Sequence, residues 1–401
     1  MNTITATCPA CGLLCDDIKI ENNNHKINVL TKGCEKAVRF FEPPLGETTP
    51  SINGKPASLQ QAIEHAAKLI KTSQQPLFAG LGTDVVGFRS VYNLAQVTNG
   101  SLQHMNAQSM ARNLKVLQST GWQTTTLTEV KNRADVIVCF GTDIVSHNPR
   151  FFERFVDCDG MFVEAKQREV FFIGNDFVGE HVKFKTEISS KATPVSLLAC
   201  SVVDLPEITL VLRALVAGKT LKAATVAGVK VSDLQTIADK LKTAKYAVLA
   251  WVAKDLDFPH AELTIQNITE TVAILNQTTR AAGLPLGGSD GDTTANNANA
   301  WLSGLALNDD VIAHDLMVWV NSLDNDKWPP PPNNKPLIVF GNSNFAYNKV
   351  SDVFIPVATP GLDCSGTLFR VDSAVILPLK KVRENDLPTL TEVISEIEKL
   401  L

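Results

Sequence analysis

The chain has 401 residues, of which 44% are hydrophobic and 20% charged, and its formal net charge at pH 7 is −5. This composition is typical of a globular protein with two or three domains. The acidic balance provides no basic stripe and so argues against nucleic acid and anionic membranes as partners. No apolar run is long enough to span a bilayer, and the first residues lack the features of a signal peptide, so we expect a cytoplasmic protein.

Four of the eight cysteines lie in the first 34 residues, at Cys8, Cys11, Cys15 and Cys34. Two close spacings followed by a distant fourth cysteine are typical of iron–sulfur ligation rather than of paired zinc knuckles. This pattern predicts that the four thiolates hold one [4Fe-4S] cluster, with Cys34 at the start of a helix. Two alternatives stay open: a zinc site, or an empty site whose cysteines serve as small buried hydrophobic residues.

The region from Cys15 to residue 97 contains the first regular elements. Apolar and polar residues alternate around an Asn-rich turn over residues 18–30, which predicts a β-hairpin. Ser58 and Gln61 form a capping-box pattern at the start of an amphipathic helix. A strand at residues 76–80 and a second helix through residues 88–97 follow, so an α/β unit begins here.

Apolar runs of strand length then alternate with helical segments. The predicted strands are residues 134–141, 160–164, 246–251, 315–321 and 336–341. The predicted helices are residues 206–217, 234–244 and 388–401. Mostly apolar strands that alternate with helices are typical of doubly wound parallel sheets, so we expect two such α/β domains behind the cysteine-rich module.

Three stretches carry a family resemblance: residues 8–18 with the first cysteines, residues 129–150 with Gly-Thr-Asp after a buried strand, and residues 353–372 with Gly-Leu-Asp-Cys-Ser-Gly. In this order they resemble the B-type subunit of formylmethanofuran dehydrogenase, a member of the molybdopterin oxidoreductase superfamily. The resemblance runs essentially from end to end, and the ordered set is more specific than any one stretch.

The resemblance implies a fold in which the chain leaves its first α/β domain, builds a second one and returns. We therefore expect an iron–sulfur-type module at residues 1–55, a first domain split between residues 56–125 and 305–401, and a Rossmann-like second domain at residues 126–304. It also implies a [4Fe-4S] cluster on the cysteine module, beside a tungsten or molybdenum centre held by two pterins.

One departure from the family pattern concerns that metal centre. The dehydrogenase form holds its metal with a cysteine or selenocysteine followed by a histidine, and Ser109 and Met110 occupy these positions here. A hydroxyl is a harder ligand than a thiolate, and a thioether cannot transfer a proton as an imidazole can. The segment at residues 287–298, where relatives have a pterin-facing loop, is also altered. We therefore expect no tungsten or molybdenum pterin and no CO2 reduction. His147, after the Gly-Thr-Asp strand, either faces a pterin phosphate or fixes its own loop.

The resemblance points to the B-type subunit of the formyltransferase/hydrolase complex of methylotrophic bacteria, which converts formyl-tetrahydromethanopterin to formate. In such a complex the chemistry would lie in an amidohydrolase-like subunit and a formyltransferase subunit, with a C-type subunit beside them. This chain would be a non-redox scaffold, so whether it is itself an enzyme stays open. Two other functions remain: a catalytic tungsten or molybdenum formylmethanofuran dehydrogenase subunit that uses Ser109, and an iron–sulfur electron-transfer module.

Overall fold

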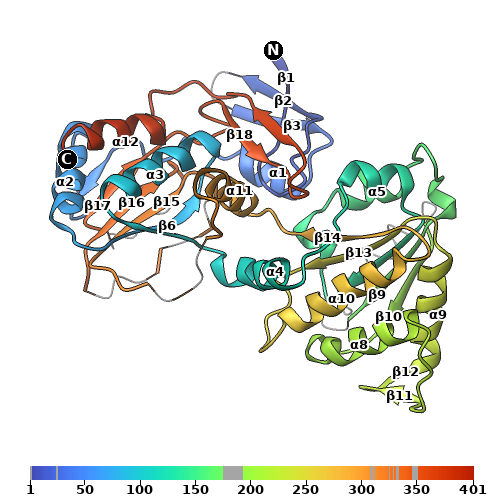
Figure 1. Cartoon of the computed structure of the whole chain (residues 1–401). Coiled ribbons are helices and arrows are strands. Elements are labelled where there is room, and N and C mark those ends of the chain that lie inside the picture. Colours follow the sequence, from blue (N-terminus) through green and yellow to red (C-terminus); the bar gives the residue numbers. More distant parts are fainter. Residues whose placement is uncertain are drawn as a thin grey trace. The chain divides into compact units, whose positions relative to one another are not determined.

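The computed structural model describes residues 2–23, 26–174, 193–307, 310, 312–324, 326–327, 329–330, 334–345 and 351–401 (Figure 1). Its internal contacts divide the chain into two compact units, Met1–Ala107 with Gly288–Leu401 and Gln108–Gly287. The sequence analysis predicted the borders of the second domain at 125/126 and 304/305, whereas the structure has them at 107/108 and 287/288. The helix α4 (Ala107–Ser119) lies in the second unit because its Asn113 side chain accepts a 2.9 Å hydrogen bond from the Trp251 indole.

The first unit begins with a small antiparallel sheet of β1 (Asn2–Ala6), β2 (Ile18–Asn23) and β3 (Lys26–Thr31). Strands β2 and β3 pair antiparallel, so the hairpin predicted over residues 18–30 is confirmed. The helix α1 (Glu35–Phe41) follows, with Cys34 at its N-cap position. The helix expected after the fourth cysteine is therefore also confirmed.

The main sheet of the first unit has seven strands in the order β5-β4-β17-β16-β15-β6-β7. Their bounds are β4 (Ser51–Ile52), β5 (Lys55–Pro56), β6 (Pro76–Gly82), β7 (Ser101–His104), β15 (Leu316–Asn321), β16 (Leu337–Gly341) and β17 (Val353–Pro356). The five strands from β17 to β7 are parallel. Numbered along the chain, they have the flavodoxin-like order 2-1-3-4-5, whose switch point lies between β6 and β15.

Besides α1, the described part of the first unit contains four helices: α2 (Leu59–Thr72), α3 (Val85–Val97), α11 (Asp292–Ser303) and α12 (Leu390–Glu398). The predicted capping box is confirmed, because the Ser58 hydroxyl accepts from the Gln61 amide and the Gln61 side chain accepts from the Ser58 amide. Helix α12 packs against both α2 and α3. A hairpin of β18 (Gly366–Phe369) and β19 (Ile376–Leu379) completes this unit.

The second unit has a five-stranded sheet in the order β10-β9-β8-β13-β14. Its strands are β8 (Val136–Phe140), β9 (Glu169–Ile173), β10 (Val195–Leu198), β13 (Ala247–Val252) and β14 (Ala281–Leu286), and all adjacent pairs are parallel. Along the chain this order is 3-2-1-4-5, as in Rossmann folds, with the switch point between β8 and β13. The expectation of an α/β protein with parallel sheets is therefore confirmed.

Helices α8 (Leu205–Val216), α9 (Val231–Thr243) and α10 (Glu262–Leu275) share one hydrophobic core with β8 and β13. The shorter elements are α5 (Leu127–Arg133), α6 (Ile144–His147), the π-helix Phe152–Val156, the 3-10 turns Ala165–Gln167 and Val202–Asp204, β11 (Thr225–Val226) and β12 (Val229–Lys230). In the part of the chain that the structure describes, every helix is too short or too polar to cross a membrane.

The strand predicted at residues 160–164 is wrong. This segment is a loop, and the strand that follows β8 is β9, which begins five residues later at Glu169. Gly160 lies against α5 so closely that a Cβ there would be 2.0 Å from the Lys131 carbonyl oxygen. Met161 and Phe162 are 75% and 59% exposed, and of this apolar run only Val163 is buried.

A fully buried arginine joins the loop and the sheet of the second unit. The Arg168 Nε donates to the Ala134 carbonyl at 3.0 Å, and its guanidinium also donates to the carbonyls of Lys131, Val156 and Cys158. Burial lowers the pKa of this guanidinium. Because four carbonyl groups depend on one side chain, Arg168 fixes α5, the loop and the start of β9 together.

We predict that Arg168→Ala lowers the free energy of unfolding of the second unit by about 3 kcal/mol or more, since it leaves buried carbonyls without donors. Hydrogen exchange of the β8 amides during urea titration reports on this unit. The exposed Arg280→Ala is the control and should change the value by less than about 0.5 kcal/mol. Equal effects of the two substitutions would contradict this role.

Candidate functional site

The loop between β1 and β2 brings the first three cysteines together. The Cys8 amide donates to the Cys15 carbonyl at 2.9 Å, and the Leu14 amide donates to the Cys11 carbonyl at 3.2 Å. Leu14 adopts a positive φ of 45°, which turns the chain back toward Cys8. The loop is therefore a tight backbone turn with its cysteine side chains on the inside.

Burial and neighbouring thiols raise the pKa of Cys8 and of Cys11. Cys8, Cys11 and Cys15 are buried, and Cys34 is half-buried. Burial raises the pKa of Cys11 to about 12, with repulsion from Cys15 and Cys34 adding to the effect. Burial also raises the pKa of Cys8, and repulsion from Cys11, Cys15 and Cys34 raises it further. Cys11, Cys15 and Cys34 thus all lie within electrostatic range of Cys8, and metal ligation by the four residues stays a prediction.

The chemistry of this donor set fits a sulfur-ligated metal group. Buried thiols become thiolates when a metal cation is present to stabilise them. A single tetrahedral zinc would bring its sulfurs to roughly 3.8 Å from one another. Among the described residues, no group of three or more His, Cys, Asp or Glu side chains is arranged to hold one metal ion. Four cysteine thiols are the ligand set of a [4Fe-4S] cluster, in which each iron takes one thiolate.

The cysteine loop is packed onto other segments of the first unit. Leu14 shares a hydrophobic cluster with Leu368 and Leu379 of the β18–β19 hairpin. The Val371 amide donates to the Gly12 carbonyl at 2.9 Å. A Cβ at Gly288 would lie 2.6 Å from the Gly12 Cα, so only glycine allows this approach. The cysteine loop therefore depends on the stretch at residues 353–372 and on the altered loop at residues 287–298.

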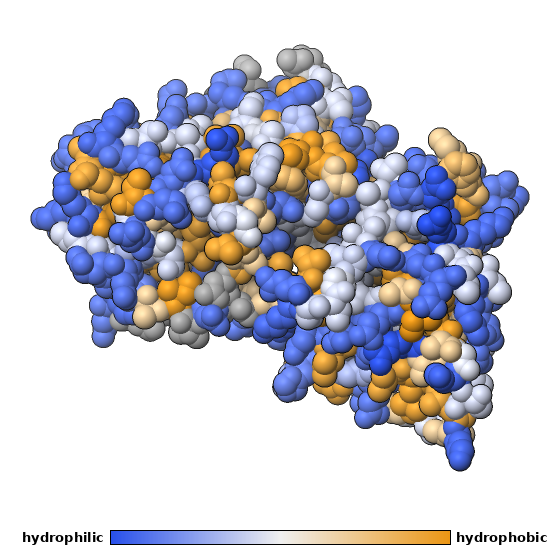
Figure 2. Space-filling view, in the orientation of Figure 1, coloured by the Kyte–Doolittle hydropathy of each residue, from blue (hydrophilic) through white to orange (hydrophobic). Residues whose placement is uncertain are grey.

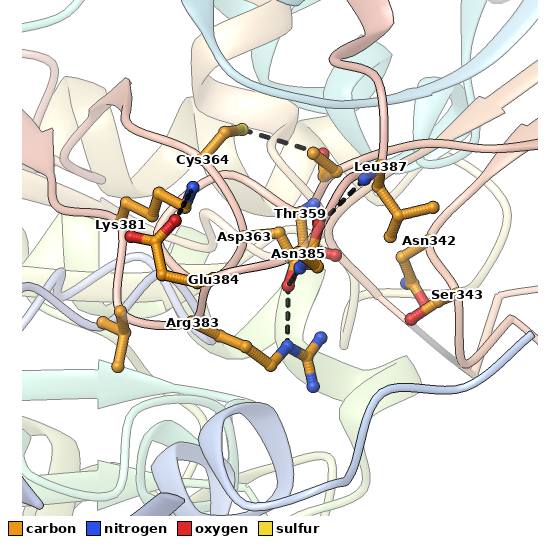
Figure 3. Close-up of polar contacts among 12 residues, drawn as sticks. Asn342, Ser343, Thr359, Asp363, Cys364, Lys381, Arg383, Glu384, Asn385 and Leu387 are labelled. Carbon is orange, nitrogen blue, oxygen red and sulfur yellow. Dashed lines mark hydrogen bonds and ion pairs between the residues drawn. The ribbon is translucent and has the colours of Figure 1, made fainter. Parts of the chain in front are cut away.

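A buried carboxylate organises the Gly-Leu-Asp-Cys-Ser-Gly segment (Figure 3). Asp363 accepts hydrogen bonds from Arg383 Nε at 2.7 Å, from the Asn385 amide group at 2.6 Å and from the Thr359 amide at 3.1 Å. The next residue is Cys364, whose pKa is raised to about 12 by burial first and then by Asp84 and Asp363. Asp363 thus ties this segment to Thr359, Arg383 and Asn385.

Ser109 and Met110 lie near the start of α4 and are half-buried. Arg112 of the same helix donates to the Ala253 carbonyl at 2.9 Å and pairs with Asp257. These contacts fix α4 in the second unit, whereas the four cysteines belong to the first unit.

At the switch point of the second unit, Asp255 joins the loops that follow β8 and β13. Its carboxylate accepts from the Thr142 hydroxyl and the Asp143 amide, both at 3.1 Å, and lies 2.7 Å from His147 Nε2. His147 thus fixes its loop, through a carboxylate rather than a backbone group. The sequence analysis did not identify Asp255. A signal was available, because Asp255 follows β13 at the same edge of the sheet at which Gly-Thr-Asp follows β8.

The switch point of the first unit holds a second polar cluster, also missed from the sequence. The Asn106 amide group donates to Asp290 Oδ2 at 3.1 Å, and His104 Nε2 lies 3.1 Å from the Asp290 carbonyl oxygen. Burial raises the pKa of Asp324 to about 6, and its hydrogen bond with Asp290 adds to the effect. The two carboxyl groups therefore share a proton, and the pair can hold or release it near neutral pH.

The fold can be compared with those of solved structures. The chain has a mixed α/β fold with parallel sheets, and two solved structures share it. Acetylene hydratase from Pelobacter acetylenicus matches it with a TM-score of 0.60 over 98% of this chain and 68% of that chain, at 8% identity. A chain of the formyltransferase/hydrolase complex (FhcABCD) from Methylorubrum extorquens, in complex with methylofuran, matches with a TM-score of 0.73 over 88% of this chain and 98% of that chain, at 23% identity.

Sequence comparison identifies more particular relatives. The B-type subunit of the tungsten-containing formylmethanofuran dehydrogenase 2 of Methanococcus maripaludis is 25% identical over 98% of this chain and 96% of its own length. Its counterpart in Methanocaldococcus jannaschii is 25% identical over 94% of this chain and 92% of its own length. The B-type subunit of the formyltransferase/hydrolase complex Fhc of Methylorubrum extorquens is 36% identical over 22% of this chain and 25% of its own length. No family model matches. The chain is thus a homologue of the B-type subunit of formylmethanofuran dehydrogenase, and the predicted resemblance is confirmed.

The shared proton of Asp290 and Asp324 makes stability depend on pH. Because the folded-state pKa of Asp324 is raised to about 6, the folded protein keeps a proton that the unfolded chain loses near pH 4. Unfolding free energy should therefore fall as the pH rises between about pH 4 and pH 6, and stay lower above it. We predict that Asp324→Asn removes this fall and gains about 1 kcal/mol at pH 8, allowing for solvent screening.

Thermal unfolding at several pH values measures the difference between variant and parent. The control is Asp326→Asn in the same loop, whose side chain is largely exposed and which should change stability little at any pH. A pH-independent effect of Asp324→Asn would contradict the shared proton.

Proposed function

We propose that this chain is a non-redox structural subunit, of the B type, in a formyltransferase/hydrolase-type complex that converts formyl-tetrahydromethanopterin to formate. Its relatives are named as subunits of enzyme assemblies, and its fold is that of a chain within such an assembly. In this proposal, an amidohydrolase-like subunit and a formyltransferase subunit carry the chemistry, with a C-type subunit beside them. This chain supplies their relative geometry.

The observation that carries the proposal is the pair Ser109 and Met110 on α4. The dehydrogenase resemblance calls for a thiolate or selenolate ligand followed by a proton-transferring histidine at these positions. A hydroxyl and a thioether supply neither function. The nearest cysteines along the chain are Cys34 and Cys139, and Cys139 is a buried residue of β8. These residues do not fit the metal ligation of the dehydrogenase form.

We propose that Cys8, Cys11, Cys15 and Cys34 hold a [4Fe-4S] cluster. Such a cluster, when bound, can carry one electron, but here its role would be structural. The cysteine loop buries Leu14 against the β18–β19 hairpin and hydrogen-bonds to Val371, so anchoring the four thiols keeps this loop docked. Metal binding then adds to the folding free energy of the N-terminal segment.

Exposed apolar residues support a role in an assembly. Trp301 and Leu305, at the end of α11 and just beyond it, are 67% and 68% exposed, and the Trp301 ring meets Phe369 edge to face. Figure 2 shows apolar patches that interrupt the polar surface of the chain. Exposed tryptophans are enriched at the centres of protein interfaces, where a partner covers them.

A second candidate function is a catalytic tungsten or molybdenum subunit that uses Ser109 as the metal ligand. The observation that favours it is the name of the near full-length relatives, both tungsten-containing dehydrogenase subunits. The Fhc relative, by contrast, matches over 90 residues. Bound pterin dinucleotide in the purified protein would favour this candidate.

The proposed cluster can be tested by removing one ligand. We predict that Cys11→Ser, in protein prepared without oxygen, loses visible iron–sulfur absorption and speeds hydrogen exchange in residues 2–50. The parallel sheets of both units should stay protected, because they have their own cores. The control is Cys158→Ser, a half-buried cysteine outside the loop. Unchanged absorption and protection in Cys11→Ser would rule out the cluster.

The scaffold role can be tested by reconstitution. We predict that the remaining subunits lose assembly and release formate at least tenfold more slowly without this chain, because their contacts are no longer held. Adding back the chain with Ser109→Ala and Met110→Ala should restore the rate to within about twofold of the parent chain. Ser109→Cys should give no formate or CO2 redox activity, since one ligand cannot rebuild a metal site.

Two outcomes would contradict the scaffold role. One is full activity of the other subunits in the absence of this chain. The other is loss of activity in the Ser109→Ala, Met110→Ala chain when assembly remains intact.

A further inference from the structure

A pocket of about 440 Å³ lies in the second unit, at the opposite end of its strands from the Asp255 cluster. It is lined by Arg133, Asp135, Phe162, Val163, Gln167, Lys245, Tyr246 and Arg280. Asp135, Tyr246 and Arg280 immediately precede β8, β13 and β14. Since these strands are parallel, the pocket marks the amino-terminal edge of the sheet.

The pocket is cationic because Arg133, Lys245 and Arg280 outnumber its one carboxylate, Asp135. Asp135 accepts from the amides of Lys245 and Tyr246 at 2.8 and 2.9 Å, so it is held against the backbone. Arg133 pairs with Glu129 at 2.7 Å and also lies 4.5 Å from the centre of the Phe162 ring. Lys245 and Arg280 form no ion pair with any residue that the structure describes. Their charges are available to a carboxylate from outside.

The rim of the pocket exposes apolar side chains on a fixed loop. The Phe162 amide donates to the Asn132 carbonyl at 3.0 Å, and the Met161 amide donates to the Asn132 side chain at 3.2 Å. The close approach of Gly160 to Lys131 holds the same loop against α5. Phe162 and Met161 are therefore held in solvent by backbone contacts, and little conformational entropy would be lost on binding.

We propose that this pocket docks an acidic segment of another subunit, in which a carboxylate meets Lys245 and Arg280 and a neighbouring apolar side chain packs on Phe162 and Met161. Aromatic residues, Met and Arg are enriched in the cores of protein interfaces. Small ligands of α/β sheets bind at the carboxyl ends of the strands, and this pocket is at the opposite edge. The proposal rests on the proposed function, because it requires a partner chain.

The experiment uses the full chain assembled with its partner subunits. Met161 is replaced by p-benzoylphenylalanine, the complex is irradiated, and the cross-linked peptide is identified by mass spectrometry. We expect a peptide of another subunit with Asp or Glu close to an apolar residue. Lys245→Glu with Arg280→Glu should weaken assembly at least tenfold, and reversing the charge of the partner's carboxylate should recover most of the loss.

The control is Lys219→Glu with Lys222→Glu, which makes the same change of charge on exposed residues of the same unit. Equal effects of the two double variants, or cross-links confined to this chain, would overturn the docking site. The proposal would also be overturned if the pocket were a nucleotide site. In that case AMP would bind at one per chain, the Lys245→Glu, Arg280→Glu variant would lose this binding, and the assembled complex would keep it. If the parent chain forms no complex at all, the proposed function fails as well, and this is visible before any variant is made.

Discussion

The pairing of β6 with β15 is the constraint on which the first unit depends. These strands lie side by side in its sheet, although the whole second unit separates them in the sequence. Beyond the strands, the Ser322 amide donates to the Gly82 carbonyl at 2.7 Å and the Ser322 hydroxyl to Thr83 at 3.1 Å. The sheet closes only when the returning chain supplies β15.

The cysteine loop depends on the same return. Its partners Leu368, Val371 and Leu379 all belong to the C-terminal part of the chain. The hydrogen bonds to Asp363 fix the segment that precedes these partners. Asp84, at the N-cap of α3, accepts from the Thr367 amide at 3.3 Å. These contacts thus link the cysteine loop to the C-terminal part of the first unit. In the proposed role, a metal group at the loop would stabilise this long-range structure without taking part in catalysis.

The sequence predicted the long, strongly patterned elements well. The capping box at Ser58, the hairpin over residues 18–30 and the buried strands around residues 136–140 and 247–252 needed only local patterns. The strand predicted at residues 160–164 was wrong, because hydrophobicity alone cannot show that Gly160 lies against α5 while the Phe162 side chain is exposed.

The functional clusters were predictable only in part. The four cysteines carry a spacing signal, so the sequence alone predicts them as metal ligands, and this stays a prediction. No such spacing signal marks Asp255, Asp290 or Asp324. Their partners come from distant parts of the sequence and meet them only at the edges of the sheets. His147 was recognised as a loop residue, but its carboxylate partner lies more than 100 residues away.

The central claim is that this chain keeps a sulfur-ligated structural site but no redox metal centre. Elemental analysis of the complex purified without oxygen, combined with mass spectrometry for pterins, tests it most directly. The account predicts about four iron atoms for each copy of this chain, with tungsten, molybdenum and pterin well below one. Stoichiometric tungsten or molybdenum with a bound pterin dinucleotide would contradict it, as would zinc at one per chain in place of iron.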